Sequence, residues 1–235
     1  MRRFASLVGV VLLSAMVVAV CGCGGGAGPG EAGTAVAPAA APPTAPYFPL
    51  AVGNTWNMKT TYYANPAAGL SLPDFPLPAG AAGSLSSNAT STSGFKITGT
   101  KTFGGAKWFV GGYTPPLPSM EPWYGRHATA GMWVQNTNAG TPYYLLKAPI
   151  KVGTKWSMAP AVPAKRKITK LGATTTVAAG TFKQCMVIQQ TYTSAALKDL
   201  VVTYWFAPGT GVVRTEIRDA GVLTTKIELV KATLK

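Results

Sequence analysis

The chain has 235 residues, of which 47% are hydrophobic and only 12% are charged, and it contains 27 Gly and 19 Pro. One or two domains fit this length, and many Gly, Pro, Thr and Tyr with little charge favour strands and turns over helices. The formal net charge is +14, but the basic residues are scattered, so we interpret them as a solvated surface; attraction to anionic lipid headgroups, wall polymers or nucleic acid is the alternative.

The N-terminus has the features of an export signal. A short basic start, residues 1–3, is followed by the uncharged segment 4–20. This segment is at the short limit for a transmembrane helix of about 17–25 residues. Its serines, its small residues and the glycine run after it favour a signal peptide. No later segment is apolar enough to span a bilayer, so we predict an exported chain that is not an integral membrane protein.

Two cysteines, Cys21 and Cys23, lie in the stretch "VVAVCGCGGGAG" at 17–28. A metal clip needs more ligands, and the rest of the chain offers one histidine and the distant Cys185. A disulfide framework needs an even set of cysteines in the mature chain. The stretch instead resembles the lipobox of bacterial lipoproteins, in which the leader is cut before a cysteine that carries a diacylglycerol.

Two registers of the lipobox are possible. Cys23 follows Gly22, a small residue that suits the peptidase, whereas Cys21 follows a branched valine. The resemblance therefore implies a signal peptide at 1–22 and a lipidated Cys23. In the other register Cys21 carries the lipid, and Cys23 stays free and can pair with Cys185.

A spacer follows the lipobox. Residues 23–46 begin with Cys23 and continue as Gly, Ala and Pro with the single charge of Glu31. Such a segment cannot bury a core, so we predict a disordered tether. Gly24 after the cysteine implies, by the rule of the lipoprotein family, the outer membrane if the cell is Gram-negative.

From residue 47 onward the sequence reads as short alternating runs. In "TWNMKTTYY" the alternation puts four side chains on one face: Trp56, Met58, Thr60 and Tyr62. In "VVRTEIR" it puts three charged side chains on the opposite face from Val213, Thr215 and Ile217: Arg214, Glu216 and Arg218. A period of two with one wet face predicts antiparallel sheet. We predict a single all-β domain over 47–235, a curved sheet or open β-barrel with irregular loops.

Glycine and proline mark the connections. The Gly-Gly pair at 104–105 predicts a tight hairpin. Two segments, 64–94 and 114–125, read as long irregular loops, which are uncommon unless functional or floppy. The second carries Trp123 and Tyr124 and is the better candidate for a site.

One decamer occurs twice: "PLAVGNTWNM" at 49–58 recurs as "PIKVGTKWSM" at 149–158. The shared Pro, Val, Gly, Trp and Met predict the same corner before two different strands, with a tight turn at Gly and an inward Trp. The alternative is that Trp56 and Trp156 form a paired clamp for a ligand.

The one local cluster of basic residues is "AKRKITK". It contains Lys165, Arg166, Lys167 and Lys170, and we interpret it as a strand whose charges alternate outward to water. It lacks the interleaved aromatic residues of single-strand binders. We therefore predict no nucleic-acid partner.

Four motifs occur in order between 47 and 218: "YFPLAVGNTW", "PIKVGTKW", "VAAGTFKQCMVI" and "TYWFAPGTGVVRTEI". They resemble a group of uncharacterised bacterial exported proteins and lipoproteins. The resemblance implies a curved antiparallel sheet or open barrel, broadly similar to carriers of lipoproteins and lipids. It implies no catalytic residue, because the shared positions are Gly, Pro, aromatic and apolar.

Catalytic residues are scarce. The chain has one histidine, His127, whose nearest acid in sequence is Glu121, and it has no G-x-S-x-G nucleophile motif. We read Cys185 as a small buried hydrophobe rather than a nucleophile. We therefore predict a protein that is not an enzyme, with a hydrolase using His127 as an alternative.

Aromatic residues are the remaining candidates for a ligand site. The positions are Trp56, Trp108, Trp123, Tyr124, Trp133 and Trp156. The alternative is that they form the core. We predict a lipid-anchored cell-envelope protein without cofactor or metal, which contacts the membrane through Cys23 and binds a hydrophobic ligand, an envelope glycan or a partner protein. A structural or assembly lipoprotein without a small ligand is the alternative.

Overall fold

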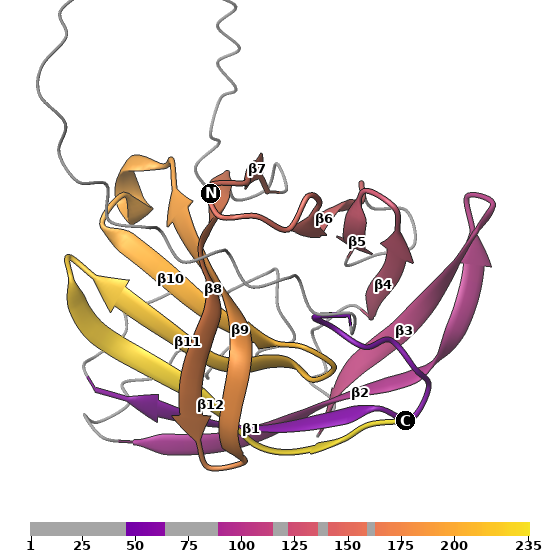
Figure 1. Ribbon diagram of the computed structural model, residues 1–235, viewed down its shortest axis with the longest axis horizontal. Helices are drawn as coiled ribbons and strands as arrows, with labels where there is room; N and C mark the ends of the chain where they lie inside the picture. Colours follow the sequence, from indigo (N-terminus) through magenta and orange to yellow (C-terminus); the bar gives the residue numbers. More distant parts are fainter. Residues whose placement is uncertain (1–45, 64–88, 115–121, 136–140, 159–162) are drawn as a thin grey trace, which may run out of the picture. The chain divides into compact units, whose positions relative to one another are not determined.

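The alternating runs form β-strands in the computed structural model, which describes residues 46–63, 89–114, 122–135, 141–158 and 163–235 (Figure 1). The strands are β1 (Thr55–Tyr62), β2 (Thr90–Phe103), β3 (Ala106–Thr114), β4 (Trp123–Ala128), β5 (Gly131–Gln135), β6 (Tyr143–Lys147), β7 (Lys155–Ser157), β8 (Ala164–Val177), β9 (Gly180–Tyr192), β10 (Leu200–Ala207), β11 (Gly211–Asp219) and β12 (Val222–Thr233). A short 3-10 helix, η1 (Ala195–Leu197), precedes β10. No helix in these ranges is long and apolar enough to cross a membrane.

All the strands belong to one 12-stranded antiparallel sheet in the order β6-β5-β4-β3-β2-β1-β12-β11-β10-β9-β8-β7. This order is two meanders, β1–β6 and β7–β12, that are joined where β1 pairs with β12. The sheet curls until it is nearly closed into a barrel, with β6 and β7 at its two edges. The predicted all-β fold, a curved antiparallel sheet or open barrel, is confirmed.

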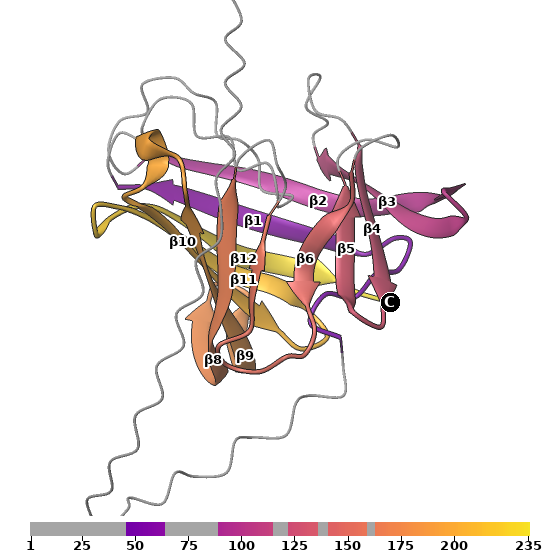
Figure 2. The same ribbon diagram turned by 90° about the horizontal axis from the view of Figure 1, so that it is seen from above.

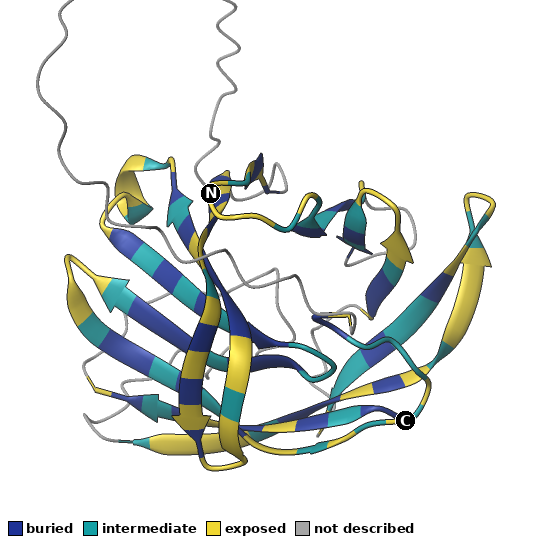
Figure 3. Cartoon of the chain, viewed as in Figure 1, coloured by how far each residue is buried: buried dark blue, intermediate teal, exposed yellow. Residues whose placement is uncertain are grey.

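Alternation along the strands separates an inner from an outer face. The four β1 side chains predicted to share a face, Trp56, Met58, Thr60 and Tyr62, are all buried. In Figure 3 buried positions alternate with exposed or half-buried positions along β1, β8 and β10. The buried apolar side chains form one continuous core cluster. Burial of apolar surface on this face, at about 25 cal/mol per Å², is therefore the main force that holds the sheet in its curled form.

The compact unit of the fold covers Ala39–Lys235 and is separate from Met1–Pro38. It contains every strand and the whole core cluster. Residues 39–235 are therefore expected to fold without the preceding segment. The predicted signal peptide, the lipidated Cys23 and nearly all of the tether lie outside the described residues.

The two predicted loops are shorter than the sequence indicated. β2 already begins at Thr90, where the alternating Thr and Ser residues pair with β1. β4 begins at Trp123, so Trp123 and Tyr124 lie on a strand and not in a loop. Polar and Pro-rich composition hid these strand ends, because pairing with a distant strand is not visible in the local sequence. Residues 64–88 and 115–121 lie outside the described residues.

The repeated decamer forms the same corner twice, as predicted. In the first corner (49–58) the Gly53 N–H donates to the Ile97 carbonyl at 2.8 Å, and in the second corner (149–158) the Gly153 N–H donates to the Ile168 carbonyl, also at 2.8 Å. The two glycines have φ values of 96° and 91°, which an L side chain rarely adopts. Each corner thus anchors the start of a strand on a buried isoleucine of the next strand.

Side chains close the two corners in equivalent ways. In the first, the Asn54 amide donates to the Pro49 carbonyl at 3.1 Å. In the second, the Thr154 hydroxyl donates to the Pro149 carbonyl at 2.8 Å. In both corners the carbonyl of the shared proline therefore accepts the side-chain bond that closes the turn.

The equivalence continues beyond the corners. The tripeptide Lys-Ile-Thr occurs in β2 and in β8, and the strand register shifts at its threonine in both. Thr98 donates to the Val110 carbonyl at 3.3 Å, and Thr169 donates to the Val187 carbonyl at 3.3 Å. The first three strands of each meander are therefore built on one plan: a corner strand, a long strand with a bulge at threonine, and a hairpin partner.

Candidate functional site

Three of the six predicted aromatic site residues lie in the core. Trp56 and Trp123 are buried and are joined through two phenylalanines. The Phe48 ring lies 5.0 Å from Trp56 and 6.0 Å from Trp123, and the Phe95 ring lies 5.9 Å and 5.3 Å from the same two indoles. Trp156 is buried elsewhere in the core. The indole N–H of Trp56 donates to the Thr210 carbonyl at 2.6 Å, so it is used inside the fold.

The other three lie outside this cluster. Trp108 stacks on Phe103 with ring centroids 5.2 Å apart, and Tyr124 meets the same ring edge-on at 5.2 Å. Trp133 is half-buried and lies against Tyr144, with centroids 3.9 Å apart. The structure thus distributes the six residues over separate places and does not bring them into one cleft. A ligand role for any of them stays a prediction.

His127 is exposed near the end of β4. Its pKa is lowered because the ring is partly desolvated, while a hydrogen bond with the Phe48 backbone acts in the opposite direction. Within the described ranges no carboxylate forms an ion pair with it. Its predicted acid neighbour Glu121 lies outside those ranges, so the hydrolase alternative remains a prediction.

The polar site that stands out is on the inner face of the sheet, at Arg166. This residue is only 1% exposed, although it carries a full positive charge. Its Nε donates to Gln190 Oε1 at 2.8 Å, and its Nη1 donates to the Leu145 carbonyl at 3.0 Å. The guanidinium also lies over the Tyr204 ring, 5.0 Å from the centroid. We call Arg166, Gln190, Tyr192 and Tyr204 the Arg166 cluster.

The rest of the Arg166 cluster is a chain of polar contacts. Gln190 Nε2 donates to the Tyr192 hydroxyl at 2.8 Å, and the Tyr204 hydroxyl donates to Gln190 Oε1 at 3.3 Å. Thr215, directly opposite Tyr204 in register, has a buried hydroxyl with no hydrogen-bond partner among the described residues. Polar groups therefore gather on this part of an otherwise apolar face.

The charge of Arg166 is not balanced within the described part of the chain. None of the ion pairs found there includes Arg166, and its Nη2 atom has no hydrogen-bond partner. Arginine does not lose its proton in proteins, so this side chain cannot become neutral. Buried charges are normally paired, because desolvation costs several kcal/mol per ion. The site therefore has the properties of an incomplete anion-binding site.

The Arg166 cluster lies beside the seam between the sheet edges β6 and β7. No backbone ladder joins these strands. Instead, the Trp156 indole N–H of β7 donates to the Tyr144 carbonyl of β6 at 3.1 Å, and Arg166 bonds the adjacent Leu145 carbonyl. Figure 2 shows β6 beside the β8 end of the sheet. Two side chains thus take the place of a strand ladder at this position.

The sequence interpretation of "AKRKITK" was wrong for one residue. Lys165, Lys167 and Lys170 are exposed as expected, but Arg166 is buried. Strict alternation puts Arg166 on the face of its neighbours Ala164 and Ile168, which are apolar. This alternation indicates a buried Arg166. The shared positive charge of the four residues instead favoured the interpretation of one solvated group.

Cysteine and the metal-ligating side chains are two further residue classes that could form a site. Cys185 is free and buried, and burial raises its pKa to about 11, which fits the predicted role of a small hydrophobe. Among the described residues no group of three or more His, Cys, Asp or Glu side chains could hold a metal ion.

Comparisons with known proteins give the following. No family model matches the chain, and no curated protein sequence matches it significantly. Two crystal structures are similar to it: a Bacteroides fragilis protein assigned as exported, with a YmcC-like fold, at 12% identity and a TM-score of 0.49, and a Parabacteroides distasonis protein assigned as a lipoprotein, at 15% identity and a TM-score of 0.46. Each match covers 80% of this chain and 99% of the other.

Proposed function

We propose that the chain is a lipid-anchored, non-enzymatic protein of the bacterial cell envelope whose barrel binds an amphiphile with an anionic head. The lipobox resemblance at Cys23 and the spacer after it support the anchor. The observation that supports binding is the buried Arg166 guanidinium, which has no carboxylate partner among the described residues.

The chemistry of the Arg166 cluster favours a carboxylate or phosphate head. Such a group accepts hydrogen bonds from the unpartnered Nη2 and supplies the missing negative charge. The hydroxyl of Thr215 offers a further donor opposite Tyr204. The apolar tail lies against the aromatic and aliphatic side chains of the inner face. Entry is at the β6–β7 seam, because only side-chain bonds have to open there.

The binding test uses residues 39–235, with oleate as an anionic probe and oleyl alcohol as its uncharged counterpart. We expect the wild type to bind oleate more tightly than the alcohol in titration calorimetry. The Arg166→Met variant should lose this preference, because it keeps the volume and removes the charge. Equal binding of oleate by the wild type and Arg166→Met, or no binding by the wild type, contradicts the proposal.

Arg126→Met is the matched control. Arg126 also lies over an indole, 4.9 Å from the centre of Trp108, and its Nε has no hydrogen-bond partner in the described ranges. It is half-buried and outside the core cluster. This variant should bind oleate like the wild type. Loss of binding in both variants would indicate a general effect of charge.

A purely structural or assembly lipoprotein is the second candidate, because Arg166 and Trp156 bond the β6 carbonyls across the seam. In that case Arg166 mainly stabilises the contact between the two sheet edges. Arg166→Met should then lower the free energy of unfolding of the ligand-free protein by about 3 kcal/mol or more. If Arg166 is an anion site, the ligand-free variant should lose less than this, because removal of a buried unpaired charge offsets the loss of the bonds to Gln190 and to the Leu145 carbonyl. Native mass spectrometry of protein released from its own membrane distinguishes the two by the presence or absence of a bound amphiphile.

The anchor is tested separately. Intact mass of the natural protein should show acyl chains on a mature N-terminus at Cys23. A protein without acyl mass contradicts the anchor and leaves the binding test unaffected. For the absence of catalysis, His127→Ala should leave the behaviour of the protein unchanged in hydrolase assays with ester and glycoside probes.

A further inference from the structure

The two ends of the sheet differ in charge. In an antiparallel meander alternate strand ends point to the same side, and the register places the start of β1 with the end of β12. The starts of β1 and β7 pair with Lys96 and Lys167, and β2 and β8 continue beyond these residues on the same side. We call this the N-terminal rim. It comprises the two corners, the turns β2–β3, β4–β5, β8–β9 and β10–β11, and the C-terminal residue. In Figure 2 the arrowheads of β6 and β8 point to this side.

Lysine gathers on the N-terminal rim. The exposed lysines at its turns, its corners and the strand ends beside them are Lys101, Lys107, Lys151, Lys155, Lys183, Lys231 and Lys235, and Lys96, Lys167 and Lys170 lie within β2 and β8. They come from both meanders and from the C-terminus. Residues that are scattered in the sequence thus become a one-sign surface, because the topology collects strand ends.

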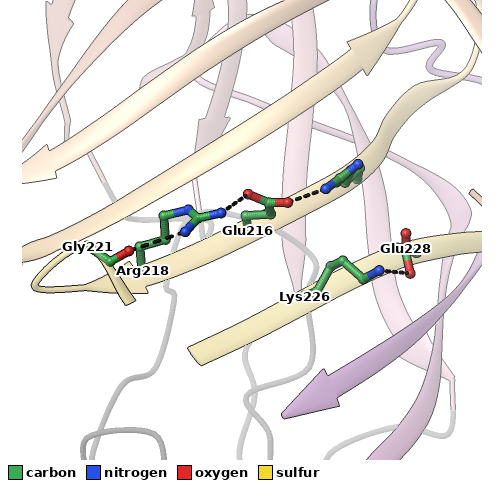
Figure 4. Close-up of polar contacts among 6 residues, drawn as sticks. Glu216, Arg218, Gly221, Lys226 and Glu228 are labelled. Carbon is green, nitrogen blue, oxygen red and sulfur yellow. Dashed lines mark hydrogen bonds and ion pairs between the residues drawn. The ribbon is translucent and has the colours of Figure 1, made fainter. Parts of the chain in front are cut away.

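The described acids lie elsewhere. Asp199 and Asp219 are at the opposite rim, where β10 begins and β11 ends, and they are exposed. Glu216 and Glu228 lie within strands and already have cationic partners: Figure 4 shows Arg218 against Glu216 and Lys226 against Glu228, at 3.2 Å and 3.0 Å. None of the acids in the described ranges therefore neutralises the N-terminal rim.

The chain joins the fold at this same rim. The Pro46 carbonyl accepts a hydrogen bond from the Gly209 N–H in the β10–β11 turn at 2.8 Å. Tyr47 and Phe48 follow it into the core. The described part of the chain therefore begins on the lysine-rich side.

We propose that the N-terminal rim docks on a membrane surface of anionic lipid headgroups. Lysine is a flexible point charge, so a spread set of lysines suits a fluid, charged surface better than one defined ligand. Each lysine held near such a surface contributes about 1 kcal/mol within a screening length of about 10 Å. The N-terminal rim is thus a second membrane attachment besides an acyl chain. Docking also orients the opposite rim away from the bilayer. This docking does not depend on ligand binding at Arg166.

The test uses residues 39–235, which lack Cys23, so that an anchor cannot cause binding. Sedimentation with vesicles of phosphatidylcholine alone is compared with vesicles that also contain phosphatidylglycerol, at low and high salt. We expect binding only to the anionic vesicles, and its loss at high salt. Binding to neither vesicle, or equally to both, overturns the proposal.

A pair of matched variants locates the surface. Lys107→Gln with Lys183→Gln removes two charges from the N-terminal rim. Lys59→Gln with Lys198→Gln removes the same charge away from this rim, where both residues are also exposed. The rim pair should lower the vesicle partition coefficient about thirtyfold, from two contributions of about 1 kcal/mol each, and the control pair less than about threefold. Equal losses would show an effect of net charge and overturn the assignment to this rim.

Binding of soluble polyanions tests whether the N-terminal rim is selective for lipid headgroups. If duplex DNA or heparin binds residues 39–235 as tightly as the anionic vesicles do at the same salt, and the rim variants weaken all of them alike, the rim is a general polyanion surface and the lipid proposal is wrong. Binding to anionic vesicles should protect Lys107 and Lys183 from acetylation and leave Lys59 and Lys198 reactive.

Discussion

The first and second corners share their glycine conformation and their closing hydrogen bonds but have different surroundings, and the second also has a cis peptide bond before its proline, Ala148–Pro149. Trp56 begins β1, which pairs with a strand on each side, and the residue opposite it in β2 is Phe95. Trp156 begins β7, which pairs only with β8, and the residue opposite it is Arg166. The same local unit is therefore used once inside the sheet and once at its edge.

The difference shows what an edge requires. Inside the sheet the neighbouring strand satisfies the backbone, so the residue opposite the tryptophan can be aromatic and serve the core. At the edge, β6 has carbonyls without a ladder partner on that side, and Trp156 and Arg166 donate to two of them. Backbone carbonyls at a sheet edge are costly to bury without a hydrogen-bond partner. The polar side chain of Arg166 therefore lies where the sheet ends.

The largest expected effect is from removing the two indoles. Trp56→Ala should lower the free energy of unfolding in urea by about 3–5 kcal/mol, as for other buried aromatic residues. Trp156→Ala should cost less, near the lower end of about 3–5 kcal/mol, because Trp56 also loses its packing on Phe48 and Phe95. A larger loss for Trp156→Ala would show that the seam, and not the aromatic core, limits stability.

The loss of stability at alkaline pH tests one buried titratable group on the third strand of each meander. Burial raises the pKa of Cys185 on β9 to about 11 and also raises the pKa of Tyr113 on β3. The folded state keeps both groups protonated, so their contribution is complete below the unfolded-state pKa values and is lost as the pH rises above about 9. We expect a loss of about 2 kcal/mol between about pH 9 and 11.

Unfolding free energies across this pH range check the prediction. Cys185→Ala should flatten the pH dependence from about pH 9, and Tyr113→Phe should flatten it from about pH 10. If the free energy of unfolding falls with pH equally steeply in both variants and in the wild type, these groups do not control stability at alkaline pH.

The corner glycines should respond alike. Gly53→Ala and Gly153→Ala each place a Cβ at a positive φ, which costs about 1–2 kcal/mol. At Gly53 the Cβ meets only the flexible Lys235 side chain, and at Gly153 it meets nothing within 4 Å. Thermal unfolding should therefore shift by the same amount in both variants. Unequal shifts would show that the equivalence of the corners is only geometric.

The smallest expected effect is at the two bulges. Thr98→Val and Thr169→Val each remove one hydroxyl bond to a backbone carbonyl. Each should lower the free energy of unfolding by about 0.5–1 kcal/mol, with Thr98 at the lower end because its bond is exposed and that of Thr169 is partly buried. A reversed order in urea titrations would mean that burial does not decide the strength of this bond.

The sequence predicted the features that depend on local pattern. Alternation gave the correct faces for β1, and the repeated decamer gave the correct corner, because both depend only on near neighbours in the chain. In β11 the predicted wet face is only partly correct, because Glu216 is buried between two half-buried arginines that bind it, Arg214 and Arg218. The starts of β2 and β4 were missed because they depend on pairing with a distant strand. Strict alternation predicts that Arg166 is buried, but the positive charges of the neighbouring lysines favoured the interpretation of a fully solvated cluster.

The lysine-rich rim was beyond sequence reasoning. Its lysines are distant in the chain, and only the alternating direction of the strands brings their ends to one side. The aromatic candidates illustrate the opposite case. Their composition was plain, yet composition does not distinguish a core position such as Trp123 from a surface position such as Trp133.

The pairing of β1 with β12 has a consequence for biosynthesis. The strand made earliest needs as its neighbour the strand made last, so the two meanders cannot be joined while the ribosome is still working. Until β12 has been made, β1 lacks one of its two neighbours and the two meanders remain unconnected as a sheet. The topology therefore delays completion of the curled sheet until its last strand is available.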